Sequence, residues 1–267
     1  MTSQAAIGVF DSGLGGLTVV RALLARLPNE SLLYVGDTAR VPYGPKSPET
    51  VQRYSRQIAD WLVAEGVKII VVACNTATAH ALPQLQAAMP VPVIGVVEPG
   101  ARAAVESGIG GRIGVIGTAG TIASRAYERA IHRLSPNADV MALACPLFVP
   151  LVEEGWLEHE ATRLIAHSYL APLRDAGVRS LVLGCTHYPL LAPTIAREMG
   201  SGVRLIDSAE ETAAEAARVL DAHGLASEAG ATPVHRFVAS DAPDRFLAIG
   251  SRFLEGTIAG VEYVPFG

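Results

Sequence analysis

Two cysteines occupy matching positions in two halves of this chain, and this internal match constrains the fold more than any other feature. Residues 66–76 run through a glycine, a basic residue, an apolar run and a small residue to Cys74 and a polar cluster. Residues 177–187 repeat that order around Cys185. Two further pairs of strand-like segments recur in the same order at nearly the same separation, residues 7–13 with 113–119 and residues 91–94 with 203–206. The sequence therefore predicts an internal duplication with one thiol in each copy.

Short apolar runs alternate with amphipathic stretches along the chain. Most runs are continuous in Val, Ile and Leu, which is typical of strands buried on both faces of a parallel sheet. We expect strands at residues 6–10, 32–35, 69–73, 93–96, 112–116, 140–143, 181–184, 203–206 and 234–239. Helical patterns lie between them, and this β-α-β rhythm predicts an α/β protein with doubly wound parallel sheets.

Two helix starts are readable from local spacing. Ser47 followed by Pro48 is typical of an N-cap with proline at the first helical position. Ser208 and Glu211 have the spacing of a capping box before the apolar pattern of residues 213–219.

The duplication predicts two pseudo-symmetric α/β domains with the active site in the cleft between them. The first domain is expected to comprise residues 1–97 together with 207–267, and the second residues 98–206. The C-terminal segment is too short to form a core of its own, so we expect it to pack back onto the first domain.

Composition excludes several classes of protein. The 267 residues are 50% hydrophobic, enough for sizeable cores. A net charge of −5 without basic clusters argues against nucleic-acid binding. No apolar run is long enough to span a membrane, and the first residues lack the features of a signal peptide. Three cysteines without close spacing do not indicate a disulfide framework, so a reducing cytoplasm is expected.

Polar clusters follow four of the predicted strands, at residues 11–16, 74–76, 117–121 and 184–187. Ligands of open parallel sheets bind beyond the carboxyl ends of the strands. Each cluster precedes a helical pattern, so backbone N–H groups and helix dipoles are expected to favour an anion such as a carboxylate. A turn-rich segment, residues 42–45, follows the second strand and is placed to fold over the same cleft.

The cysteines have two readings. A single buried cysteine is most often a small core residue, whereas a symmetry-matched pair at strand ends favours a catalytic role for Cys74 and Cys185. Cys145 has no counterpart in the other half and is predicted to be structural.

Nucleotide, metal and pyridoxal phosphate sites are disfavoured. Residues 11–16 lack both the full G-x-G-x-x-G spacing and a Lys-Ser/Thr ending. His187, beside Cys185, has no partner at metal-ligand spacing and is expected to tune the thiol instead. The lysines, Lys46 and Lys68, do not resemble a buried Schiff-base lysine, so chemistry without a cofactor is expected. Glu153 is readable either as half of a helix-surface pair with its neighbour or as a cleft carboxylate.

The chain resembles the aspartate/glutamate racemase superfamily, in particular its glutamate-specific members. The resemblance runs through nearly the whole length and rests on residues 10–16 (FDSGLGG), 41–44 (VPYG), 73–77 (ACNTA), 145–148 (CPLF) and 184–189 (GCTHYP). Aspartate-specific members typically carry glutamate after the second Cys-Thr pair, where this chain has His187.

The resemblance implies a cofactor-independent amino-acid racemase, an isomerase acting on glutamate, with Cys74 and Cys185 as its two acid/base residues. It implies substrate contacts or thiol support from Asp11, Ser12, Tyr43, Gly44, Asn75, Thr76, Thr186 and His187, and a weaker assignment of Thr118 and Glu153. The product D-glutamate would feed bacterial peptidoglycan synthesis. Family members are often homodimers, so a homodimer is expected, with no metal, nucleic acid or membrane partner.

The resemblance implies a two-base reaction. A thiolate on one face of the α-carbon removes a proton while a thiol on the other face delivers one, so the configuration inverts. Two alternatives stay open at this stage: an aspartate or hydantoin racemase of the same scaffold, and a non-catalytic protein that binds an acidic amino acid.

Overall fold

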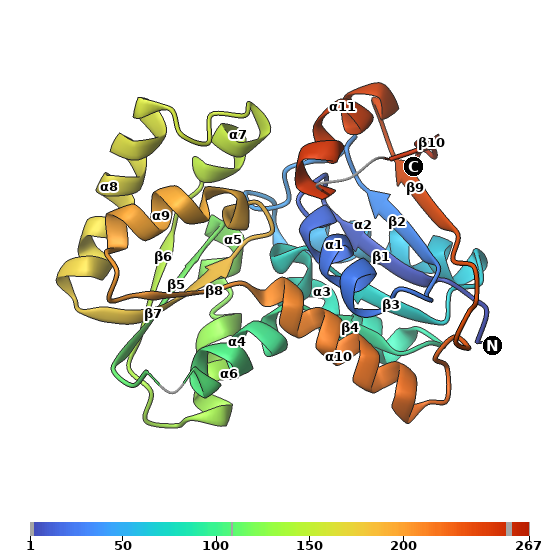
Figure 1. The fold of residues 1–267 in the computed structure, drawn as a ribbon, viewed down its shortest axis with the longest axis horizontal. Helices are drawn as coiled ribbons and strands as arrows, with labels where there is room; N and C mark the ends of the chain where they lie inside the picture. Colours follow the sequence, from blue (N-terminus) through green and yellow to red (C-terminus); the bar gives the residue numbers. More distant parts are fainter. Residues whose placement is uncertain (1–2, 108, 255–257, 267) are drawn as a thin grey trace.

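Two parallel β-sheets lie side by side in the computed structural model, which describes residues 3–107, 109–254 and 258–266 (Figure 1). The six-stranded sheet has the order β10-β9-β2-β1-β3-β4 and the four-stranded sheet the order β6-β5-β7-β8, with parallel pairing throughout. The strands are β1 (Ile7–Asp11), β2 (Leu32–Gly36), β3 (Ile69–Val72), β4 (Val93–Gly95), β5 (Arg112–Gly117), β6 (Val140–Ala144), β7 (Val178–Gly184), β8 (Arg204–Ile206), β9 (His235–Ala239) and β10 (Glu262–Tyr263).

The internal duplication is visible in the strand order. Strands β2-β1-β3-β4 of the first sheet correspond to β6-β5-β7-β8 of the second, with the same neighbours in the same sequence. The segments matched in the sequence therefore occupy equivalent strands, and Cys74 and Cys185 follow the equivalent strands β3 and β7. The predicted α/β class with two parallel sheets is confirmed.

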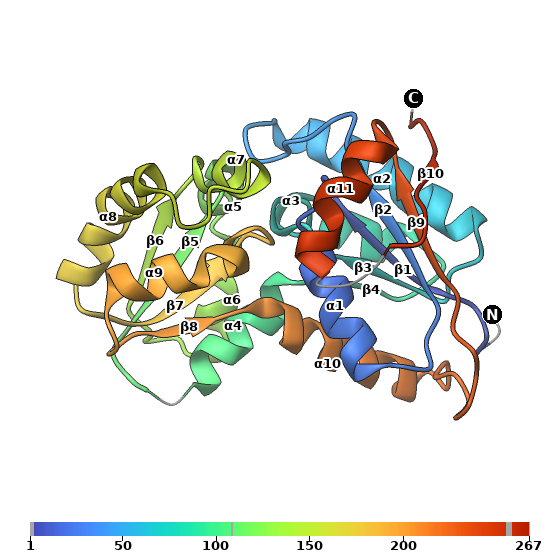
Figure 2. The ribbon, with the colours of Figure 1, turned by 45° about the horizontal axis from the view of Figure 1, so that its top comes forward.

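Helices cover both faces of each sheet, as the continuous apolar strands require. On the six-stranded sheet, α1 (Leu17–Arg26), α10 (Ser208–Ala222) and α11 (Pro243–Leu254) share one apolar core, and α2 (Pro48–Ala64) and α3 (Asn75–Ala88) share another. In Figure 2, α1 and α11 lie in front of that sheet.

The four-stranded sheet has α4 (Val97–Glu106) and α6 (Ala126–Leu134) on one face. Its other face carries α7 (Phe148–Glu153), α8 (Glu160–Asp175), the 3-10 turn η1 (Tyr188–Leu191) and α9 (Ala192–Met199), while the short α5 (Ala119–Ala123) packs against α3 and β6. None of the helices within the described residues is both long and apolar enough to cross a bilayer.

The C-terminal segment returns to the first sheet. After β8 the chain enters α10, which packs against both α1 and α4, and β9 then pairs with β2. The largest apolar core extends from Ile7 of the first sheet to Leu181 of the second, so the two halves share buried surface. We propose domain boundaries near residues 97 and 207, with residues 1–97 and 207–267 in one domain and 98–206 in the other.

One of the two predicted helix caps is wrong. Ser47 caps α2 by accepting the Thr50 N–H, with Pro48 as the first helical residue, as expected. α10 instead begins one residue earlier than a capping box at Ser208 requires. Its N-cap is Asp207, whose Oδ1 accepts the Ala209 N–H at 2.9 Å. Asp and Ser are both good N-cap residues, so the local spacing did not distinguish Asp207 from Ser208 as the cap.

Lys68 is fully buried, which the sequence did not indicate. Its Nζ lies 2.5 Å from Glu30 Oε2 and donates to the Ser3 carbonyl at 2.6 Å. The pair lies at the amino end of β3, the opposite end of the strand from Cys74. Lys68 is therefore a paired core cation with no access to the polar strand ends.

Replacing the observed cap tests the helix start. Asp207→Ala is expected to lower the free energy of unfolding by about 1 kcal/mol, whereas Asp207→Asn keeps an accepting oxygen and should lose much less. Urea unfolding of both variants measures the difference. Equal stability of Asp207→Ala and the unmodified chain would show that this cap contributes nothing.

Candidate active site

Both cysteines line one small cavity between the two sheets. The cavity has a volume of about 30 Å³ and is lined by Ser12, Val41, Pro42, Tyr43, Gly44, Cys74, Asn75, Thr76, Thr118, Val149, Cys185, Thr186 and His187. Every residue proposed from the sequence is among them except Asp11 and Glu153. Val41 and Val149 were not proposed, and Pro42 was expected only as part of the turn at residues 42–45, because apolar side chains carry no chemical signal.

The sheets can approach this closely because one loop lacks a side chain. A Cβ at Gly15 would lie 2.2 Å from Thr186 Oγ1 and 2.5 Å from His187 Nδ1, so no larger residue fits without moving the second half of the site. The turn containing Gly44 docks on the other side, where its carbonyl accepts the Gly120 N–H at 2.9 Å. Loops from both sheets thus close around the same space.

Cys74 sits at a helix N-terminus. It is the N-cap of α3: its Sγ accepts the Ala77 N–H at 3.4 Å, and its thiol contacts Ser12 Oγ at 3.6 Å. Burial, with the negative charge of Asp11, raises the pKa of the Cys74 thiol to about 12, although the contacts from Ala77 and Ser12 oppose the shift. Cys74 therefore rests as a neutral thiol near pH 7.

Cys185 has a different local environment, and the expected helix directly after it is absent. The chain continues through Thr186 and His187 before the 3-10 turn η1 begins at Tyr188, whose N–H bonds to the Cys185 carbonyl at 3.0 Å. The sulfur instead lies 3.9 Å from His187 Nδ1. The group beside the Cys185 sulfur is therefore the imidazole of His187 and not the N-terminus of a helix.

Glu153 holds that imidazole from the far side. His187 Nε2 lies 3.1 Å from Glu153 Oε1, and His187 is 3% exposed. Burial lowers the pKa of His187, but contacts with Cys185 and Glu153, and the charges of Cys185 and Asp11, outweigh it and raise the pKa to about 10. His187 is therefore an imidazolium at neutral pH. Of the two readings left open for Glu153, the structure supports the cleft carboxylate.

Asp11 lies beneath the cavity rather than in its wall. The residue is 1% exposed, its Oδ2 accepts the Gly13 N–H at 3.0 Å, and its Oδ1 has no hydrogen-bond partner in the part of the chain that the structure describes. Burial raises the pKa of this carboxyl, against the opposing charge of His187 and three backbone N–H groups. An unpaired buried carboxylate oxygen is costly and indicates a cationic ligand.

Threonine hydroxyls join the two halves of the site. Thr76 Oγ1 lies 2.8 Å from Thr118 Oγ1, and both contact Thr121 Oγ1, at 3.2 and 3.0 Å. Thr121 was part of a predicted polar cluster but was not singled out. Hydroxyl groups both donate and accept, so this network can turn its protons toward a bound carboxylate.

Tyr43 is held by a carboxylate that sequence reasoning missed. Its hydroxyl donates to Asp37 Oδ2, and Asp37 also accepts from Arg40 Nε at 2.7 Å and Ser240 Oγ at 2.8 Å. Asp37 directly follows β2, so its place at a strand end was the available signal. Ser240 follows β9, so the C-terminal segment supports the site.

A wider cavity of about 350 Å³ adjoins the small one and shares Val41, Pro42, Gly44, Thr118 and Val149 with it. Its remaining lining is rich in proline and it reaches Glu153. We call this wider cavity, which lies next to the one that both cysteines line, the mouth.

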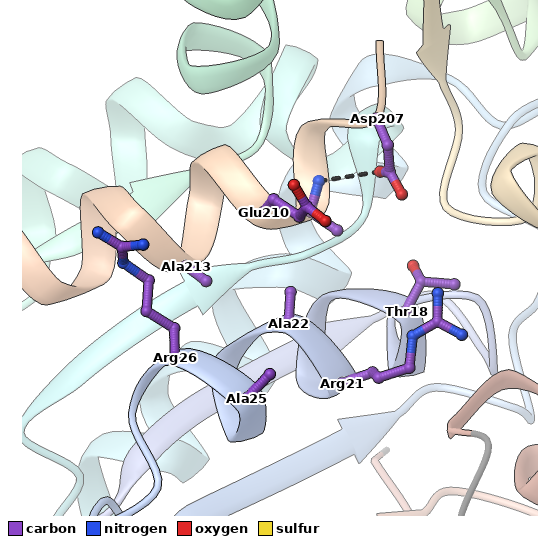
Figure 3. Close-up of a pocket in the computed structure, with 9 residues that line it drawn as sticks. Thr18, Arg21, Ala22, Ala25, Arg26, Asp207, Glu210 and Ala213 are labelled. Atoms are coloured by element: carbon purple, nitrogen blue, oxygen red, sulfur yellow. Dashed lines mark hydrogen bonds between the residues drawn. The ribbon is translucent and has the colours of Figure 1, made fainter. Parts of the chain in front are cut away.

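Another cavity, of about 520 Å³, lies elsewhere, between α1 and α10 (Figure 3). Arg21 and Arg26 extend from α1, and Asp207 and Glu210 lie at the start of α10. No cysteine is among the described residues that line it, and at its edge the Thr18 hydroxyl donates to the Gly15 carbonyl at 2.9 Å and lies 3.3 Å from the Thr186 carbonyl. Within the described chain, no three His, Cys, Asp or Glu side chains gather as metal ligands would.

Comparison with known proteins decides the family. The family model described as Asp/Glu/Hydantoin racemase matches residues 7–216. The chain belongs to this family.

Similar proteins share almost its whole length. A glutamate racemase of Geobacter metallireducens is 53% identical over 259 residues, covering 97% of this chain and 96% of that protein. Among solved structures, a glutamate racemase isoform of Bacillus anthracis has a TM-score of 0.94 at 43% identity, covering 98% of both chains. Glutamate racemase from Francisella tularensis in complex with D-glutamate has a TM-score of 0.93 at 38% identity, covering 99% of this chain and 98% of that one.

Removing the Glu153 carboxylate tests the electrostatics of this racemase-family site. In Glu153→Gln the imidazolium loses a negative partner, so the pKa of His187 should fall from about 10 by roughly one unit or more. A nitrogen-detected NMR titration of the His187 ring measures the shift. Glu154→Gln is the matched control, because Glu154 is an exposed neighbour that does not touch His187. An unchanged His187 pKa in Glu153→Gln would contradict the assignment.

Proposed function

We propose that this chain is a glutamate racemase, which interconverts L- and D-glutamate with two cysteines and without an organic cofactor or a metal. The observation that carries the proposal is the placing of two thiols, from equivalent strands of two duplicated sheets, in the wall of one closed cavity. Relatives about half identical over the full length are glutamate racemases, which favours glutamate over aspartate or a hydantoin as the substrate.

We propose that the two thiols have opposite roles, because their surroundings differ in charge. The His187 imidazolium beside Cys185 stabilises a thiolate there, whereas burial and the charge of Asp11 keep Cys74 protonated. The Cys185 thiolate takes the α-proton from one face of the substrate, and the Cys74 S–H delivers its proton to the other face. The product state then carries a Cys185 thiol and a Cys74 thiolate, which together are ready for the reverse reaction.

The α-proton is far less acidic than a thiol, so the site must stabilise the developing carbanion. We propose that Asp11 Oδ1, which has no hydrogen-bond partner among the described residues, receives the substrate ammonium once the site has opened, so that the ammonium stays protonated and lowers the barrier. Hydrogen-bond donors around the cavity, Ser12, Asn75, Thr76, Thr118 and Thr186, are placed to hold the carboxylates. Their fixed positions remove the cost of reorienting water during the reaction.

The described state is closed. A space of about 30 Å³ is close to one water molecule's share of liquid volume, so glutamate can enter only if the loops part. The turn carrying Tyr43 and Gly44 and the helix carrying Val149 lie between the cavity and its mouth, and we propose that they separate to admit substrate. Closure then excludes water and strengthens each polar contact.

The proposed cellular role is the supply of D-glutamate for bacterial peptidoglycan in the cytoplasm, where thiols stay reduced. A homodimer is the proposed assembly. Three large apolar side chains on and around α7 and α8, Leu147, Trp156 and Leu164, are between 47% and 65% exposed. A subunit interface that covers them would remove apolar surface from water. Light scattering at micromolar concentration distinguishes a dimer from a monomer.

Exchange of the α-proton in heavy water tests the function directly. The unmodified chain, dialysed free of metal and pyridoxal phosphate, should racemise both glutamate enantiomers and incorporate deuterium. Cys74→Ser and Cys185→Ser should each reduce racemisation by at least about 100-fold, with residual exchange that depends on the starting enantiomer.

Cys145→Ser is the matched control, since that buried thiol lies outside the cavity wall and should be dispensable. Binding of glutamate without exchange would establish a binding protein instead. Faster turnover of aspartate than of glutamate would establish the other racemase class. Full activity of either single cysteine variant would refute the two-thiol reaction.

A further inference from the structure

We infer that Tyr127, on α6, is a positioning residue that aims the side-chain amide of Asn75 into the cavity as a hydrogen-bond donor for a substrate carboxylate. The inference rests on the proposed function and extends it to a residue outside the cavity wall. Tyr127 does not line the cavity, and no local motif singled it out.

The geometry is that of a fixed amide. The Tyr127 hydroxyl donates to Asn75 Oδ1 at 2.7 Å, and both residues are buried, at 2% and 3% exposure. Asn75 Nδ2 has no hydrogen-bond partner among the described residues, although Asn75 lines the cavity. One end of the amide is therefore held and the other end is unsatisfied, in a place where an unsatisfied donor is costly without a ligand.

The direction of the hydrogen bond sets the polarity of the amide. Asn75 Oδ1 can only accept a hydrogen bond, so the phenolic hydrogen of Tyr127 is donated to it. Burial raises the pKa of Tyr127, so the phenol keeps its hydrogen throughout the neutral range. An amide that accepts through Oδ1 presents Nδ2 on its other side, so the cavity receives a donor suited to a carboxylate.

Two glycines make room for the Tyr127 ring. A Cβ at Gly184 would lie 3.0 Å from Cε2 of the ring, and one at Gly100 would lie 3.3 Å from its Cε1 and its hydroxyl oxygen. Gly184 immediately precedes Cys185, so the ring packs against the strand end that carries this thiol. The hydrogen bond from the Tyr127 hydroxyl therefore joins α6, on the four-stranded sheet, to Asn75, the first residue of α3, which follows Cys74. The Asn75 donor is consequently aligned only while both halves of the site are in place.

The test is a double-mutant cycle on glutamate turnover. Tyr127→Phe keeps the ring and removes the hydroxyl, so kcat/KM should fall about tenfold, chiefly through a higher KM, with a nearly unchanged melting temperature. Asn75→Ala removes the aimed group itself. In the Asn75→Ala background, adding Tyr127→Phe should cause no further loss, because the positioned amide is already gone. Tyr169→Phe is the matched control, since its hydroxyl accepts the Leu147 N–H and Tyr169 does not line the cavity.

A merely structural role gives a different result. If the loss from Tyr127→Phe multiplies in full with that from Asn75→Ala, or if Tyr127→Phe turns over glutamate like the unmodified chain, the inference is overturned. Turnover by the unmodified chain in the same assay reports separately on the proposed function.

A second measurement needs no Tyr127 variant. The side-chain amide NMR signals of Asn75, assigned by their absence in Asn75→Ala, should shift when D-glutamate is added to the unmodified chain. Signals that stay unmoved at saturating glutamate would show that Nδ2 does not contact the ligand, and would overturn the inference even if Tyr127→Phe failed to fold.

Discussion

A closed cavity that holds two sulfur atoms and one cationic side chain is the constraint on which the site depends. Among the described residues that line it, His187 is the one that carries positive charge at neutral pH, and it lies against Cys185. Cys74 faces the charge of buried Asp11 instead. The two thiols are therefore chemically unequal although they occupy equivalent strands. An enzyme that removes one proton and delivers another requires this inequality. Two neutral thiols would include no base to remove the proton, and two thiolates would include no acid to deliver one.

The fold places the two cysteines at equivalent positions but gives them different neighbours. Duplicated parallel sheets place equivalent strand ends on opposite sides of one space, since parallel strands deliver their polar residues at one edge. The chain then continues differently after each cysteine. Cys74 caps α3 and is held by a backbone N–H, whereas the helix after Cys185 is delayed until Tyr188, which frees His187 to meet the sulfur and Glu153. A local difference of a few residues thus gives the two cysteines the unequal surroundings that the proposed acid and base roles require.

Much of this organisation could be predicted from the sequence. Continuous apolar runs placed nine of the ten strands to within a few residues, and β10, with two residues, is too short to form a pattern. The polar strand ends indicated eight of the thirteen residues of the cavity wall, and the turn at residues 42–45 three more. The sequence could not show which side chains meet across it. Glu153 reaches His187, and Tyr127 reaches Asn75, only because α7 and α6 pack where they do. The burial of Lys68 could not be predicted for the same reason, since its partner Glu30 lies on a separate loop.

The proposed division of roles, with Cys185 beside His187 as the base and Cys74 as the acid, is the central claim, and the ultraviolet absorbance of thiolate tests it most directly. Difference spectra near neutral pH, with and without acid quenching, should show one thiolate per chain in the ligand-free protein. That absorbance should persist in Cys74→Ser and disappear in Cys185→Ser. Its loss from Cys74→Ser with retention in Cys185→Ser, or its absence from the unmodified chain, would contradict the account.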